Sequence, residues 1–182
     1  MSVWLIVIIV IAAVILFVIV TYNGLITLKN RVQEAASDID VQLKRRFELI
    51  PNLVNTVKGY AKHETELFEK VTKERASMAN GSTADKINSS NQLSETLKSL
   101  FAVAEAYPDL KANQNFLQMQ ADLTDTQDKI MASQRFYNAN VRDFNTKLQV
   151  FPTNIYGKQL GFTQFEFIEA ADAEKQNVKV EF

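Results

Sequence analysis

The chain has no cysteine, and its 182 residues include only 5 glycines, 3 prolines, 1 tryptophan and 1 histidine. The absence of cysteine excludes disulfide bonds and thiolate metal sites. Scarce glycine and proline leave few turn signals, which favours long helices in a chain of this length. A single histidine supplies too few nitrogen ligands for a typical zinc or di-iron centre.

The chain also lacks an excess of charge of either sign. Lysine and arginine together number 20, against 21 aspartates and glutamates. No basic patch with interleaved aromatic residues is present, so the sequence argues against a nucleic-acid partner. Outside its most apolar stretch the chain retains roughly 160 residues, enough for one domain with a substantial core.

An apolar run at residues 3–20 contains no charged or amide side chain. About 20 such residues cross the roughly 30 Å hydrocarbon layer of a bilayer. No basic region precedes the run and no small-residue cleavage motif follows it, so we expect a retained membrane anchor at residues 1–22, not a cleaved signal peptide. Trp4 and Tyr22 suit the two interfacial belts of such a span.

Basic residues are distributed unequally around this run. Lys29 and Arg31 follow it closely, whereas only the α-amino group precedes it. The positive-inside rule therefore favours an N-terminus outside and a cytoplasmic main domain.

Apolar residues then recur in steps of three and four, which is typical of helices with one buried face. We expect a helix that continues from the anchor to about Phe47, a break at Pro51, and further helices at residues 51–78, 84–106 and 108–150. Residues 23–151 would then form an all-α, antiparallel four-helix bundle. The alternative is three long helices, with the first two joined as a kinked rod at Pro51.

The tail at residues 152–182 is rich in aromatic and apolar residues. Phe165 and Phe167 alternate with polar residues as in short strands. We expect this irregular tail either to lie in the membrane interface or to contact the bundle end or a neighbouring protomer. The residues that would make this contact are Ile155, Tyr156, Leu160, Phe162, Phe165 and Phe167.

Polar residues interrupt the apolar seams and predict a structural network that sets helix register. Arg45 or Arg46 would pair with a carboxylate, with Asp40, Glu48 and Glu64 as the candidates. The predicted network comprises Asp40, Gln42, Arg45, Arg46, Glu64, Arg75, Asn113 and Asn138.

A metal or catalytic site is the competing interpretation of these polar residues. The residue three before His63 is Tyr60 and the residue four after it is Leu67, so neither the Glu-x-x-His nor the His-Glu-x-x-His motif is present. No serine or threonine lies in a glycine-rich strained turn. We therefore predict no catalytic residue, no metal and no cofactor.

Longer stretches of the chain resemble the LemA family. The resemblance is carried by residues 40–54, which read DVQLKRRFELIPNLV, and by residues 57–64, 110–116, 135–138 and 151–152. It implies a bacterial membrane protein with one N-terminal span and a helical bundle, and it implies no enzymatic activity.

Two hypotheses about function follow. The first is a non-enzymatic scaffold of the cell envelope, anchored in the inner membrane, whose partners are membrane lipid, further copies of itself and other envelope proteins. The second is a membrane-tethered sensor or adaptor that binds a soluble partner or ligand.

Overall fold

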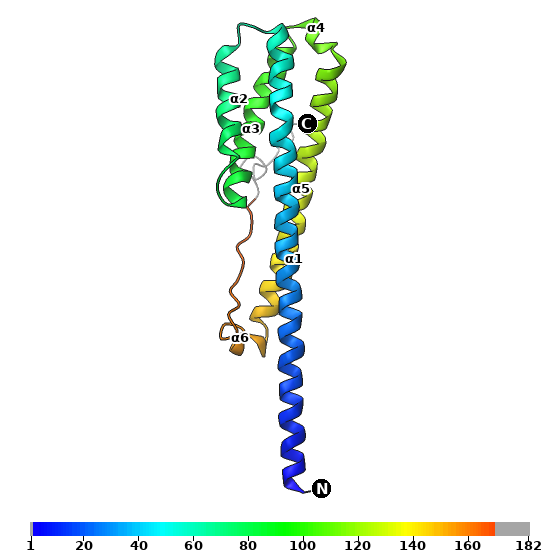
Figure 1. Cartoon of the computed structure of the whole chain (residues 1–182), viewed down its shortest axis with the longest axis vertical. Coiled ribbons are helices and arrows are strands. Elements are labelled where there is room, and N and C mark those ends of the chain that lie inside the picture. The colour runs from blue at the N-terminus through cyan, green and yellow to red at the C-terminus, as the bar shows by residue number, and fades with distance from the viewer. Residues whose placement is uncertain (1, 170–182) are drawn as a thin grey trace, which may run out of the picture. The chain divides into compact units, whose positions relative to one another are not determined.

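A computed structural model describes residues 2–169, and the regular structure in that part of the chain is entirely helical (Figure 1). The predicted all-α fold is therefore confirmed. The helices are α1 (Val3–Tyr60), α2 (Thr65–Ser77), α3 (Thr83–Ala104), α4 (Pro108–Lys111), α5 (Gln114–Gln149) and α6 (Thr153–Tyr156).

The chain divides into two compact units, and α1 and α5 each contribute to both. The first unit comprises Met1–Ala35 and Arg135–Phe167. The second comprises Ala36–Gln134 and Ile168–Phe182, of which residues 170–182 lie outside the described part.

Four long helical segments form the bundle of the second unit, and the short helix α4 lies between α3 and α5 in sequence. The C-terminal part of α1, then α2, α3 and the N-terminal part of α5 lie side by side, each antiparallel to the one before it (Figure 1). The predicted antiparallel four-helix bundle is thus present. Its apolar core includes Ile39, Leu43, Ile50, Leu53, Val57, Phe68, Val71, Ile87, Leu93, Leu97, Leu100, Phe116, Leu123 and Ile130.

The predicted helix break at Pro51 is wrong, because α1 continues through this proline to Tyr60. A proline inside a helix removes one backbone hydrogen bond and crowds the preceding turn. Here Ile50 and Leu53 are buried on either side of it, and their packing sustains the helix. The chain instead turns after Tyr60, so the predicted helix over residues 51–78 is split between α1 and α2.

The predicted helix over residues 108–150 is also divided, into α4 and α5. Ala112 and Asn113 separate them, and Asn113 Oδ1 accepts a hydrogen bond from the Phe116 backbone N–H at 3.1 Å. A side-chain acceptor of this kind satisfies one of the unpaired N–H groups at a helix start. The start of α3 is closer to its predicted position and is stabilised by a reciprocal capping pair between Ser82 and Asp85.

The N-terminal part of α1, in the first unit, is long and apolar enough to cross a membrane. None of its most apolar 18-residue window is buried against other parts of the protein. An apolar helix that is exposed all round requires a nonpolar environment, and a bilayer supplies one.

The remainder of the first unit packs α5 and the following tail against α1. Its buried cluster comprises Leu25, Val32, Val141, Phe144, Leu148 and Phe162. Residues 162–169 belong to no helix or strand, so the tail is irregular as predicted, and the alternation at Phe165 and Phe167 does not mark a strand. The Phe165 backbone bonds to the Asn145 side chain, where a strand would need a second backbone. Apolar and polar residues also alternate in sequence at positions 178–182, which lie outside the described residues.

Candidate functional site

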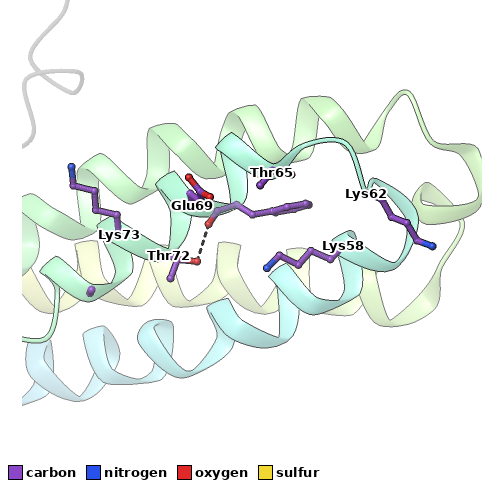
Figure 2. A pocket seen from close by; sticks show the side chains of 8 residues that line it. Lys58, Lys62, Thr65, Glu69, Thr72 and Lys73 are labelled. Carbon is purple, nitrogen blue, oxygen red and sulfur yellow. Dashed lines mark hydrogen bonds between the residues drawn. The ribbon is translucent and has the colours of Figure 1, made fainter.

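An open groove of ≈ 680 Å³ lies between the end of α1 and α2 (Figure 2). The turn after α1 brings the two helices together, and side chains from both line the groove. Its lining comprises Lys58, Lys62, Thr65, Phe68, Glu69, Thr72, Lys73 and Ala76.

The groove combines a basic rim with an apolar floor. Three lysines oppose one glutamate, so its formal charge is positive. Lys58 Nζ lies 5.4 Å from the centre of the buried Phe68 ring, within the range of a cation–π contact. The Thr72 hydroxyl donates to the Phe68 carbonyl at 2.8 Å and is thereby occupied. The groove therefore suits an anionic group attached to an apolar body.

A buried arginine lies at the centre of the second unit. Arg46, on α1, is 3% exposed and donates hydrogen bonds to Ser90 Oγ at 2.9 Å, to Ser94 Oγ at 2.8 Å and to Gln127 Oε1. All three partners are neutral, and no carboxylate in the described part of the chain pairs with Arg46. Of the two arginines for which a carboxylate partner was predicted, Arg46 is the one that bonds to neutral groups.

Burial without a counter-ion lowers the pKa of Arg46 to about 10, so the residue stays protonated at neutral pH. Its Nε and the Gln42 Oε1, which lies one helical turn earlier, are both buried without a hydrogen-bond partner among residues 2–169. A buried cation with neutral partners costs stability but fixes how α1, α3 and α5 are rotated against one another.

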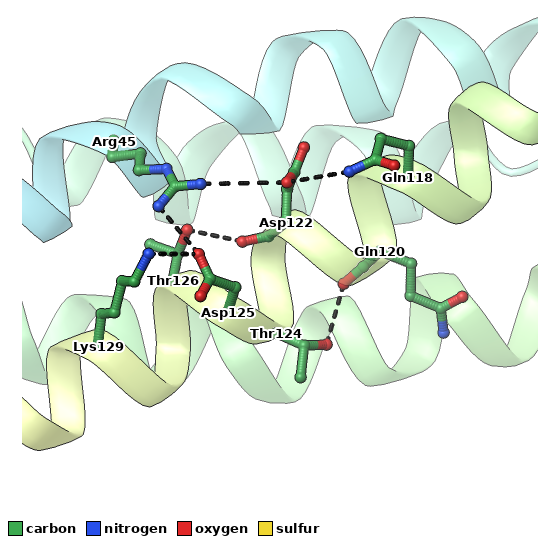
Figure 3. A network of polar contacts seen from close by, with 8 residues as sticks. All are labelled: Arg45, Gln118, Gln120, Asp122, Thr124, Asp125, Thr126 and Lys129. Carbon is green, nitrogen blue, oxygen red and sulfur yellow. Dashed lines mark hydrogen bonds and ion pairs between the residues drawn. The ribbon is translucent and has the colours of Figure 1, made fainter.

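Arg45 does pair with carboxylates, but with residues far from it in sequence. Its Nη1 lies 3.0 Å from Asp125 Oδ2 and its Nη2 lies 4.0 Å from Asp122 Oδ1, both on α5 (Figure 3). Lys129 also contacts Asp125, at 2.9 Å, and its hydrogen bond is the main reason that the pKa of Asp125 is lowered. The predicted pairing of Arg45 with Asp40, Glu48 or Glu64 is wrong, because helix rotation directs Arg45 towards α5.

The other members of the predicted polar network are dispersed. Asp40 pairs with Lys86 on α3 at 3.1 Å, and Glu64 precedes α2 without a capping side-chain bond. Arg75 donates to the Phe47 carbonyl at 2.9 Å and covers the ring of the same residue.

Two predicted asparagines lie apart as well. Asn113 donates to the Tyr60 hydroxyl at 3.0 Å, which ties the start of α5 to the end of α1. Asn138 belongs to the first unit, whereas Asn113 and the other predicted residues belong to the second. Within the second unit, Asp40, Arg45, Arg46, Arg75 and Asn113 each bond to a different set of partners.

The predicted contact residues of the tail separate into two groups. Phe162 is buried and Phe165 half-buried, and both rings contact the Phe144 ring edge-on. Tyr156, which precedes both in sequence, is also half-buried. The three that remain exposed are Ile155, Leu160 and Phe167.

Sequence reasoning missed Asn145, which is 7% exposed. Its amide donates to the Phe165 carbonyl at 2.9 Å and accepts from the Phe165 N–H at 3.0 Å, so one side chain holds both backbone groups of the tail residue. Ser90, Ser94 and Gln127 were missed too. A polar residue on an apolar seam is the signal that would have identified Asn145 and Ser90.

No group of three or more histidine, cysteine or acidic side chains within the described residues is placed to hold a metal ion.

Comparison with known proteins adds a family and several relatives. The model of the LemA family matches residues 35–182. The chain is similar to Protein LemA of Metamycoplasma hominis, with 30% identity over 159 residues that cover 86% of this chain and 72% of that protein.

Two further relatives carry a different name. The chain is similar to Magnetosome protein MamQ of Magnetospirillum gryphiswaldense, with 21% identity over 179 residues, and to Magnetosome protein MamQ 2 of Paramagnetospirillum magneticum, with 22% identity over 179 residues. Each of these matches covers 84% of this chain and 66% of the relative, slightly less than two thirds of its length.

Proposed function

The chain belongs to the LemA family, and on this premise we propose that it is a non-enzymatic, membrane-anchored scaffold that self-associates in the bacterial cell envelope. One observation carries the proposal. The 58-residue helix α1 contains both the apolar span and the first helix of the bundle, with no loop between them. The scaffold is thus attached to its anchor through a continuous helix.

Self-association is favoured by confinement to a membrane. Copies held in one bilayer meet at high effective concentration, so modest contacts suffice to assemble them. Val41, Leu117 and Phe136 are large apolar residues outside the span, and all three are exposed. The names of the relatives also support a structural role, because none of them states a reaction.

Energy transfer between copies in vesicles tests the scaffold. The chain has no cysteine, so Asn80→Cys in the exposed turn after α2 provides one labelling site. We expect transfer between donor-labelled and acceptor-labelled copies to persist when added lipid dilutes the protein. The triple variant Val41→Ser, Leu117→Ser, Phe136→Ser should lose that transfer. A wild-type signal that falls in proportion to dilution would contradict self-association.

The proposed location is the inner membrane, with the N-terminus outside and the bundle in the cytoplasm. Lys29 and Arg31 follow the span, and the positive-inside rule favours this arrangement. The thiol of Asn80→Cys should then resist a membrane-impermeant maleimide in intact cells and react after permeabilisation. Labelling before permeabilisation would reverse the orientation.

The groove between α1 and α2 favours a second candidate function, an adaptor that binds a soluble partner through an anionic segment. The variant Lys58→Gln, Lys62→Gln, Lys73→Gln removes the basic rim. Lys98→Gln, on the exposed surface of α3, is the matched control. An adaptor would lose a co-purifying protein in the triple variant alone, with energy transfer between copies unchanged.

A further inference from the structure

The turn after α5, which comprises residues 151–160 and includes α6, places its large apolar side chains outward. Thr153 and Gly157 are buried on the inner side, and a Cβ on Gly157 would lie only 2.5 Å from Leu148 Cδ1. Phe151 and Ile155, in contrast, are 78% and 62% exposed. Exposed apolar residues are common on folded proteins, but two large ones on one short segment, with small residues on its inner side, form a local apolar surface. The outer surface of this turn therefore suits a nonpolar environment.

Packing in the first unit holds this turn beside the end of the membrane anchor. The Phe162 ring lies 5.6 Å from the Tyr22 ring and joins the same buried cluster as Leu25. Tyr22 follows the last residue of the apolar run, Val20, by about 3 Å of helix. The turn thus lies near the level at which α1 leaves its apolar segment.

The charge of the turn matches a lipid surface. Lys158 is the only charged residue between positions 150 and 165. An open groove of ≈ 590 Å³ adjoins it and is also lined by Gln149, Asn154 and Phe162. An ammonium and three amides, the third from Gln164, share this lining with Leu148 and Phe162 and suit a lipid phosphate whose acyl chains continue into the bilayer.

We propose that residues 151–160 form a second membrane contact. Phe151, Ile155 and Leu160 insert into the boundary between headgroups and acyl chains, and Lys158 lies at the phosphates of the same leaflet. Interfacial segments of this kind reach about 5–10 Å into that boundary. We choose lipid as the contacting partner because the turn packs beside the part of α1 at which the anchor would leave the bilayer. The proposal rests on the anchoring proposed above.

Site-directed spin labelling of the full chain measures this depth directly. The variants Phe151→Cys and Ile155→Cys each carry one thiol, at positions whose exposure leaves folding undisturbed. Val10→Cys provides the lipid reference within the anchor, and Asn80→Cys provides the water reference. Each labelled protein is placed in vesicles made of equal parts phosphatidylcholine and phosphatidylglycerol. Collisions with oxygen, which concentrates in lipid, are compared with collisions with a water-soluble nickel chelate.

We expect the ratio of oxygen to nickel collisions at positions 151 and 155 to exceed the ratio at position 80 severalfold and to approach that at position 10. A ratio equal to that at position 80 would place the turn in water and overturn the proposal. Low access to both reagents, with broadening from neighbouring spin labels, would place another copy there and also overturn it. If position 10 itself is in water, the anchor and the proposed scaffold fail, which is a separate outcome.

Discussion

Asn145 holds the tail against α5, and its replacement by aspartate tests this function. The substitution changes one amide nitrogen to an oxygen and leaves the size of the side chain almost unchanged. The bond from the Phe165 N–H to Oδ1 survives, whereas the bond from Nδ2 to the Phe165 carbonyl is lost. In the wild type, Asn145 Nδ2 lies 2.9 Å from the Phe165 carbonyl oxygen. In the variant a carboxylate oxygen would take the place of Nδ2 and would face that carbonyl oxygen without a hydrogen between them.

The cost follows from burial and from the lost bond. A hydrogen bond contributes about 0.5–1.5 kcal/mol, and an unpaired buried polar group costs about 1–3 kcal/mol. Asn145 is buried, so Asn145→Asp should destabilise the attached tail by about 2 kcal/mol. The population with a detached tail would rise by a factor of roughly 30.

Hydrogen exchange at the Phe165 amide is the assay. This N–H keeps its acceptor in Asn145→Asp, so faster exchange reports detachment of the whole tail segment. Asn140→Asp is the control, because Asn140 lies on the same helix and its side-chain amide donates to the Phe136 carbonyl of that helix. Unchanged exchange at Phe165 in Asn145→Asp, or equal acceleration in the control, would refute the reasoning.

Three further predictions concern positions in both units. Arg46→Met should lower the free energy of unfolding by about 1–3 kcal/mol, because the buried oxygens of Ser90 and Gln127 lose their donor. Arg46→Glu should lower it further, by about 3 kcal/mol or more, because it also buries an unpaired carboxylate. Urea denaturation in detergent separates the two, and equal losses would contradict the argument. Gly157→Ala should lower the melting temperature because its Cβ would clash with Leu148, whereas Gly24→Ala, with nothing within 4 Å of its Cβ, should raise it slightly. Asp125→Asn should lower the melting temperature at neutral pH, since the pKa of Asp125 is held below its usual value by Lys129 and then Arg45. A carboxyl group with a lowered pKa stabilises the fold fully above its unfolded pKa of about 4, and this contribution is lost as pH falls through the lower folded pKa. The difference between variant and wild type should therefore begin to shrink near pH 4 and disappear below the folded pKa, and a difference that grows there would contradict the assignment.

Family membership and helical architecture were predictable because both depend on local sequence. The spacing of Val32, Ile39 and Leu43 shows one apolar helix face, and all three are buried. Pro51 shows the limit of local rules. The residue preceding a proline usually ends a helix, but burial of Ile50 and Leu53 outweighed that preference.

The partners of the arginines were not predictable in the same way. Arg45 meets Asp125, 80 positions later, and Arg46 meets Ser90, 44 positions later. Which of two adjacent arginines faces the core depends on the rotation of α1 against α3 and α5. Spacing within α1 carries no information about that rotation.

By itself the sequence determined the apolar anchor, the helical periodicity and the family, because hydropathy and local spacing are properties of neighbouring residues. Only the tertiary structure decided that Arg46 lies among neutral groups, that Asn145 holds the tail, and that Phe151 and Ile155 face outward beside the anchor. Each of these depends on contacts between segments far apart in the chain. Such contacts arise when helices pack, and no local pattern records them.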